Sequence, residues 1–273
     1  MLFKFVAGNN LKSALKKSNN LLLKNNIPII NYISEDCKIN NEKIVFNEYN
    51  NLINNINNKY ILALKLSSLN FNKNYINDIA LKCNEKNIKL IIDAENDYNI
   101  EKYRNYTNEL IYKYNKYNLN IIKTHQLYRK DSLNELKDDI RLFKSKNIKF
   151  STKLVRGAYW NTENKLGHLY TNKNDTDNNY NEGLFECFNN INNNFIAATH
   201  NKISIDFILK LSKRKKNIIL AHLMGMNENY MKDLYIQKAT YIPYGPYKEM
   251  IPYLIRRLYE NIDQIKYITP LNI

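Results

Sequence analysis

Eight short apolar runs rich in β-branched residues recur along this chain of 273 residues, and they constrain its fold more than any other feature. The segments between them, such as 74–87 and 131–147, have the spacing of amphipathic helices. This strand–helix alternation indicates a parallel sheet with right-handed crossovers, and eight units predict closure into a (β/α)8 barrel of the α/β class. The expected strands are 27–33, 60–68, 88–95, 119–126, 148–157, 194–201, 217–225 and 239–245.

A doubly wound open sheet is the alternative fold. It would bind a dinucleotide through a G-x-G-x-x-G turn, which the sequence lacks, and the six glycines of the chain form no Walker phosphate loop. We therefore expect residues 27–273 to form the barrel. Residues 1–26 should form a short N-terminal segment, with a helix that packs on the outside of the barrel.

Composition bears on several classes of function. The formal charge of +15 comes mostly from dispersed lysines, and the dense run "KRKK" at 213–216 is typical of a solvated turn, with anionic lipid or nucleic acid as alternative partners. The three cysteines, Cys37, Cys83 and Cys187, are far apart and predict no disulfide framework. The histidines show no HxxxH spacing, so no metal site is expected. No run approaches the ~18 apolar residues of a membrane helix.

Polar side chains gather toward the carboxyl ends of seven of the apolar runs. In a (β/α)8 barrel these ends form one rim around one cavity, which is where such enzymes place their active sites. Singly, each residue could be a satisfied polar group of the core, but together they favour a site. They are Lys65, Asp93, Gln126, Lys153, Arg156, Thr199, His200, His222 and Tyr241.

The charged residues of this rim are mostly cationic. Adjacent arginines at 256 and 257, with Glu260 one helical turn on, offer fork-shaped donors suited to a carboxylate or a phosphate. Trp160, Leu223 and Tyr241 add flat or apolar surface for a ring. Since no nucleophile with a paired base appears, and no carboxylate pair placed for glycoside hydrolysis, a bound cofactor should supply the chemistry.

Three motifs resemble the proline dehydrogenase family, whose members are flavin enzymes on a distorted (β/α)8 barrel. They are "KLVRGAYW" (153–160), "ATHN" (198–201) and "YIPYGP…YLIRRLYEN" (241–261). Further likeness follows the family's order nearly from end to end, in "FVAG" (5–8), "INYISED" (30–36), "ALKLSSL" (63–69), "LIIDAEN" (90–96), "THQLYRKDS" (124–132), "DTDNNY" (175–180) and "LMGM" (223–226).

The resemblance implies a substrate site for L-proline. Arg256 and Arg257 would bind the proline carboxylate, with Glu260 orienting both guanidinium groups. Lys65 would add a third positive contact, and Asp93 would position the cationic side chains. Tyr241 and Leu223 would pack on the proline ring; because hydroxyproline dehydrogenases tend to replace this tyrosine with a smaller residue, Tyr241 favours proline.

The resemblance also implies non-covalently bound FAD. Gln126 would hydrogen-bond the edge of the isoalloxazine, and the ribose and pyrophosphate would lie near Thr199 and His200. Lys153 stands where many bacterial members carry an arginine that touches flavin N5, and a lysine can donate there without the arginine fork. The remaining positions along the flavin are Arg156, Gly157, Ala158 and Trp160.

The implied reaction moves a hydride from proline C5 to flavin N5, giving Δ1-pyrroline-5-carboxylate, and a quinone then accepts the electrons. A basic face could support peripheral membrane contact, and nucleic acid is not an expected partner. The alternatives are a hydroxyproline dehydrogenase and a non-catalytic basic barrel. The family suggests a mitochondrial location, although the sequence shows no recognisable transit peptide, so a cytoplasmic one stays open. The length suggests a monofunctional form.

Overall fold

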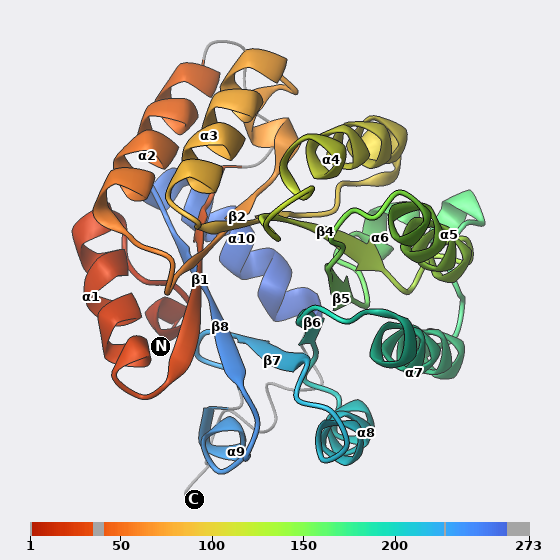
Figure 1. Ribbon diagram of the computed structural model, residues 1–273. Coiled ribbons are helices and arrows are strands. Elements are labelled where there is room, and N and C mark those ends of the chain that lie inside the picture. The colour runs from red at the N-terminus through yellow and green to blue at the C-terminus, as the bar shows by residue number, and fades with distance from the viewer. Residues whose placement is uncertain (1, 35–40, 227, 261–273) are drawn as a thin grey trace, which may run out of the picture.

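Eight parallel strands close into a barrel in the order β1-β2-β3-β4-β5-β6-β7-β8, with helices around it (Figure 1). The structure is a computed structural model that describes the backbone of residues 2–34, 41–226 and 228–260, and the side chains of 4–34, 41–226 and 228–255. The predicted fold class is confirmed, because every neighbouring pair of strands is parallel and β8 pairs with β1.

All eight strands form where the apolar runs predict them, but most are shorter than the runs. The predicted strand 60–68 ends at Leu64, because the chain then turns into a 3-10 helix; the run 148–157 contributes only four paired residues. The strands are β1 Asn26–Tyr32, β2 Ile61–Leu64, β3 Lys89–Ile92, β4 Ile121–Gln126, β5 Thr152–Val155, β6 Phe195–Ala198, β7 Ile218–Leu223 and β8 Lys238–Tyr244.

Ten α-helices and four 3-10 helices connect these strands within the described residues. The α-helices are α1 Leu11–Leu22, α2 Glu42–Asn55, α3 Lys73–Glu85, α4 Ile100–Tyr114, α5 Ser132–Ser145, α6 Trp160–Glu163, α7 Lys173–Asn190, α8 Lys202–Ser212, α9 Glu228–Lys232 and α10 Tyr247–Glu260. The 3-10 helices are η1 Leu2–Phe5, η2 Leu66–Leu69, η3 Asp97–Asn99 and η4 Asn164–Leu166. None of the described helices combines the length and the apolar character that crossing a bilayer requires.

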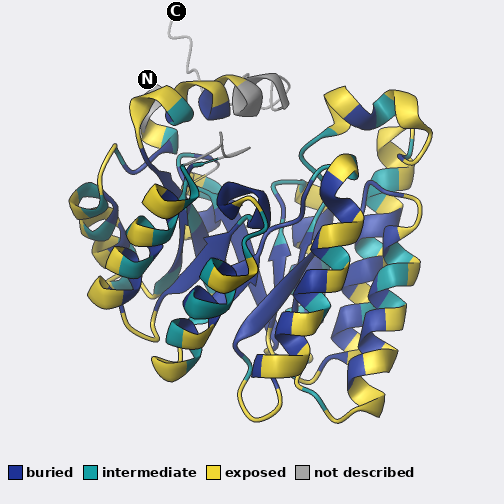
Figure 2. Ribbon diagram, turned by 90° about the horizontal axis from the view of Figure 1, so that it is seen from above, coloured by how far each residue is buried: buried dark blue, intermediate teal, exposed yellow. Residues whose placement is uncertain are grey.

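The hydrophobic core has two layers because successive strand residues point to opposite faces of the barrel wall. A small cluster fills the barrel, and a larger one packs between strands and helices, which leaves the helices exposed only on their outer faces (Figure 2). The inner cluster is Ile29, Ile61, Ala63, Ile91, Ile122, Ile196, Ile219, Ala221 and Ala239. Because side chains alternate along each strand, these inner positions determine which later side chains can face the cavity.

Two helices are placed differently from the helices that connect successive strands. Only two residues separate β8 from α10, and α10 lies across the carboxyl end of the barrel instead of packing beside it (Figures 1 and 2). Helix α1 instead packs against β1 and β8 on the outside. The division of the chain at residue 26 stays a prediction. The consequence for the site is that α10 covers the rim where the strands end.

Candidate functional site

A cavity of about 1490 Å³ opens at the carboxyl ends of the strands. Lys65, Asp93, Leu223 and Tyr241 each continue the inward alternation of their own strand, two residues beyond an inner-core position. Most of the predicted site residues line this cavity: Lys65, Asp93, Gln126, Lys153, Arg156, Gly157, Ala158, Thr199, His200, Leu223 and Tyr241.

An ion pair between Asp93 and Lys153 lies in the cavity wall. The Lys153 ammonium donates to Asp93 Oδ1, and the Tyr241 hydroxyl donates to Asp93 Oδ2 at 2.6 Å. Lys153 Nζ also lies 5.1 Å from the centre of the Tyr241 ring. Burial, and next the charge of Asp93, raise the pKa of Tyr241 well above its usual value, so the phenol stays protonated and keeps donating. The three side chains therefore fix one another, although Asp93 follows β3 and the other two come from β5 and β8.

Tyr159 and Asn31 are among the cavity residues that the sequence interpretation missed. The Tyr159 hydroxyl accepts a hydrogen bond from Lys65 Nζ at 2.9 Å, and the ammonium lies 5.3 Å from the ring centre. Asn31 donates through Nδ2 to the Ala63 carbonyl at 3.1 Å and also lines the cavity. Asn31 could have been found, because it is the polar residue that continues the inward face of β1. Tyr159 lies in a loop, where no periodicity points to it.

Glu95 links the ends of neighbouring strands near the cavity through hydrogen bonds. Its carboxylate accepts hydrogen bonds from the Ser67 backbone N–H and from the Ser67 hydroxyl, both at 2.9 Å, and its own carbonyl accepts from Gln126 Nε2 at 2.8 Å. Glu95 thus links the segments after β2 and β3 to the end of β4. The last of these bonds also orients the Gln126 amide, with Nε2 turned toward Glu95.

His200 presents an unused hydrogen-bond donor. Its Nε2 accepts from the Leu223 backbone N–H at 3.2 Å, so the proton of the neutral ring sits on Nδ1, which is buried and has no hydrogen-bond partner among the described residues. Burial, followed by repulsion from His222 and Arg156, lowers the pKa of His200 to about 3, and the ring is neutral at pH 7. The sequence predicted no specific role for His222. Its ring centre lies 6.5 Å from that of His200, with the rings edge to face, and burial lowers the pKa of His222 to about 4.

Gly157 has a structural reason for lacking a side chain. Its φ of +152° is one that other residues avoid, and a Cβ there would lie 2.3 Å from the ring of Tyr128. Tyr128 in turn donates to the Glu163 carboxylate at 2.8 Å. Gly157 also lines the cavity, but its contact with Tyr128 requires a glycine whatever the cavity binds. Trp160, at the start of α6, is 46% exposed and is not among the described residues that line the cavity.

Helix α10 reaches the cavity through Tyr253, which is buried and lines it. The side chains of Arg256, Arg257 and Glu260 lie outside the described residues. Their predicted contacts with a carboxylate therefore stay predictions.

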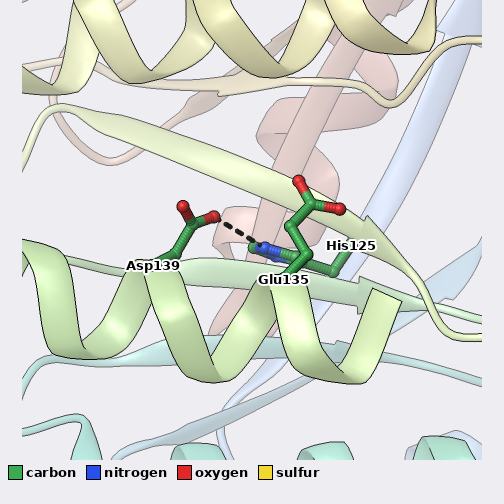
Figure 3. Close-up of side chains that lie close together, drawn as sticks. All are labelled: His125, Glu135 and Asp139. Carbon is green, nitrogen blue, oxygen red and sulfur yellow. Dashed lines mark hydrogen bonds and ion pairs between the residues drawn. The ribbon is translucent and has the colours of Figure 1, made fainter. Parts of the chain in front are cut away.

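A second cluster of ionisable side chains lies on the outer face of the barrel wall (Figure 3). His125, Glu135 and Asp139 have ligand atoms within 4.8 Å of one another, as a metal site would require. The ammonium of Lys123, however, lies 2.6 Å from Asp139 Oδ2 and 2.9 Å from Glu135 Oε1. Burial alone would raise the pKa of Asp139, but the hydrogen bond from His125 and the charge of Lys123 outweigh it and lower the pKa to about 2. Arg104 Nη2, 2.9 Å from Glu135 Oε2, supplies a second cation. The cluster is thus a charge-balanced network that joins α5 to β4.

The sequence matches a known protein family and named relatives. Residues 14–268 match the family model described as proline dehydrogenase. The chain is 32% identical over 211 residues to "Proline dehydrogenase 1, mitochondrial" of Dictyostelium discoideum, which covers 69% of this chain and 37% of that protein. It is 30% identical over 211 residues to the protein of the same name from Caenorhabditis elegans, covering 69% of this chain and 34% of that protein. The chain thus spans well under half the length of these curated relatives.

Solved structures share the fold. The crystal structure of proline utilization A (PutA) from Bdellovibrio bacteriovorus inactivated by N-propargylglycine superposes with a TM-score of 0.87 at 19% identity, over 95% of this chain and 32% of that one. The structure of proline utilization A with proline bound in remote sites gives 0.76 at 22% identity, over 85% of this chain and 28% of that one. At these identities the likeness concerns the barrel alone.

Proposed function

Because the chain belongs to the proline dehydrogenase family, we propose that it oxidises L-proline to Δ1-pyrroline-5-carboxylate with FAD and passes the electrons to a quinone. The observation that carries this proposal is the family match across residues 14–268, which includes every strand that contributes to the cavity. The named relatives are mitochondrial by name, and we extend that compartment to this protein.

The cavity suits a flavin dinucleotide in size and in the donors that it presents. Drug-sized ligands occupy roughly 300–1,000 Å³, and this cavity is larger, at about 1490 Å³. The buried Nδ1–H of His200 needs an acceptor, which a phosphate or a carbonyl oxygen of the cofactor would provide. FAD would be held by Gln126, Lys153, Arg156, Gly157, Ala158, Thr199 and His200, all of which line the cavity; Trp160, which does not line it, would have no direct part. When bound, it would supply the hydride acceptor.

The substrate would bind beside the Asp93–Lys153 pair. Lys65 and Lys153 supply positive charge for a carboxylate, and Asp93 keeps the Lys153 ammonium at one position in the wall. We assign the main carboxylate contacts to Arg256 and Arg257, with Glu260 orienting them. Holding the substrate in one pose would account for much of the rate enhancement, because orientation replaces a bimolecular encounter.

Tyr241 and Leu223 would form the surface against the proline ring. Both line the cavity. The hydrogen bond from the Tyr241 hydroxyl to Asp93 engages the polar end of this side chain, which leaves its aromatic ring to contact the substrate. The amine nitrogen of proline must be neutral to release a hydride from C5. Activity should therefore rise as the pH approaches the pKa of that amine.

The experiment that tests this function is an absorption spectrum of the purified protein, before and after anaerobic L-proline. A flavin spectrum that bleaches with proline, and much less with hydroxyproline, supports the proposal. Bound flavin that hydroxyproline bleaches faster would replace the substrate with the hydroxylated one. A protein that cannot be reconstituted with FAD would contradict the proposal and leave the basic barrel as the better alternative, which DNA- and vesicle-binding assays at graded salt would then test.

A further inference from the structure

Arg156, at the end of β5, has its guanidinium held on several sides by neighbouring elements. Nε donates to Asp177 Oδ1 at 2.6 Å, Nη1 to Thr199 Oγ1 at 2.6 Å and Nη2 to Ser204 Oγ at 2.9 Å. One face of the plane lies 4.4 Å from the centre of the Tyr180 ring. Every nitrogen of the group is engaged, so its position in the cavity wall is set by the protein before any ligand binds.

Asp177 on α7 connects three polar residues of the cavity wall. Besides Arg156, its carboxylate accepts from Lys173 Nζ and from Asn201 Nδ2, the latter at 3.1 Å. All three partners line the cavity, whereas Asp177 is not among the described residues that do. Arg156 follows β5, Lys173 begins α7 and Asn201 precedes α8. One carboxylate behind the wall thus aligns donors from three separate segments.

The same helix supplies the second support of Arg156. Tyr180 follows Asp177 by three residues and therefore lies on the same face of α7. Burial would raise the pKa of Asp177, but the hydrogen bonds from Lys173 and Arg156 outweigh burial and hold the pKa below its usual value. The carboxylate is consequently ionised throughout the neutral range, and its contacts do not depend on pH there.

We propose that Asp177 is a positioning residue for an anionic ligand, in that it aligns Arg156, Lys173 and Asn201 as one set of donors. The inference rests on the proposed function for the identity of the ligand, which is the diphosphate-bearing cofactor. Asp177 itself does not touch that ligand.

Electrostatics and positioning predict opposite effects when Asp177 loses its charge. Asp177→Asn removes a negative charge near an anion site, so charge alone would tighten the binding of an anion. The amide retains one acceptor oxygen, which cannot serve Arg156, Lys173 and Asn201 together, and its NH2 group faces donors. If alignment is what matters, binding weakens instead. The sign of the change therefore separates the two explanations.

The experiment measures the Kd of FAD by fluorescence and the Kd of ADP, as the diphosphate half, by calorimetry. It compares the wild-type chain, Asp177→Asn and the control Asp175→Asn. Asp175 lies two residues earlier on α7 and is exposed, and its carboxylate accepts only from Asn172 among the hydrogen bonds of the described side chains. We expect Asp177→Asn to weaken both ligands roughly ten- to a hundredfold, the range of charge-assisted hydrogen bonds, and the control to bind like wild type.

Unchanged or tighter binding by Asp177→Asn would overturn the positioning role while leaving the proposed function intact. A wild-type chain that binds neither FAD nor ADP would overturn both. Nitrogen-15 spectra of the wild-type protein give a test that survives if the variant fails to fold. The Arg156 guanidinium should rotate slowly about Nε–Cζ with resolved Nη protons, and fast rotation would contradict the proposal.

Discussion

Strand β4 separates two buried groups of polar side chains that share one short sequence, "KTHQ", but face different surroundings. Thr124 and Gln126 point inward and line the cavity. Lys123 and His125 point outward and join the network with Glu135 and Asp139. The two groups are equally buried, so burial does not distinguish them.

What distinguishes the two groups is how completely their polar atoms are satisfied. In the outer network Lys123 contacts two carboxylates and the Asn108 amide, and both ring nitrogens of His125 are hydrogen-bonded. On the inner side, Thr124 Oγ1 and His200 Nδ1 are buried without a hydrogen-bond partner among the described residues, whereas Glu135 Oε1 of the outer network has at least its ion pair with Lys123. A satisfied charged network stabilises the fold, whereas unsatisfied atoms that border a cavity are available to a ligand.

The largest effect should follow from breaking the outer network. Lys123→Met leaves the buried Asp139 without its ammonium partner, while the half-buried Glu135 keeps Arg104; removing one partner of a buried pair costs about 3–5 kcal/mol. Urea unfolding should show this loss of stability, while the fraction that stays folded keeps the flavin affinity of the wild type.

Lys137→Met is the matched control for Lys123→Met. Lys137 pairs with Glu182 on the surface at 2.9 Å, and exposed pairs contribute under about 1 kcal/mol. Equal losses of stability in the two variants would show that the outer network is not a stabilising feature.

The next effect in size concerns the inner group. Asp93→Asn keeps the shape of the side chain but removes the charge that holds Lys153 and accepts from Tyr241. We expect kcat/KM for proline to fall about 100-fold, or about 2.7 kcal/mol, and the unfolding free energy to fall less than in Lys123→Met, because the Lys153 ammonium that is left lines the cavity. Steady-state kinetics and urea unfolding measure the two quantities.

Asp78→Asn serves as the control for Asp93→Asn, since Asp78 pairs with Lys82 on an exposed face of α3. If Asp93→Asn retained activity within threefold of this control, Asp93 would have no role in the reaction. If it lost stability to the same extent as activity, the inner group would be structural like the outer one.

The sequence predicted the inner group better than the outer one, for a physical reason. The apolar runs located all eight strands, and the polar residues toward their carboxyl ends placed Lys65, Asp93 and Tyr241 at the rim of one cavity, which they line. The ends of the runs were less informative, because Leu66 and Leu69 are as apolar as a strand but belong to a 3-10 helix. Asn31 continues the inward face of β1 and was missed, although it is a polar residue near the end of its apolar run.

The outer network could not be predicted in the same way. Glu135 and Asp139 are one turn apart on α5, and their pairing with Lys123 depends on how that helix docks on β4. Helical spacing alone makes such acids resemble a solvated face. The hydrogen bonds of Arg156 to Asp177 and Ser204 likewise join the end of β5 to α7 and α8, and only the closed barrel brings these elements together.

A smaller effect should appear as a pH dependence of stability. The pKa of Asp139 is about 2 in the folded protein, below its usual value of 3.8. The stabilisation is therefore complete above pH 4 and is lost as the pH falls toward 2, because the unfolded chain takes up the proton first. This difference corresponds to about 2 kcal/mol. The free energy of unfolding, measured from pH 6 to pH 2.5, should fall less steeply with decreasing pH in Asp139→Asn than in the wild type. Identical slopes would contradict the assignment.

The smallest effect sharpens the inner side of the comparison. Tyr241→Phe removes only the hydroxyl that donates to Asp93 at 2.6 Å and keeps the ring against the cavity. A hydrogen bond to a charged group contributes about 1.5 kcal/mol or more, so kcat/KM for proline should fall about tenfold. In an Asp93→Asn background the same change should have a much smaller effect, because the charged acceptor is already gone. A full tenfold loss in that background would mean that Tyr241 acts on the substrate directly and not through Asp93.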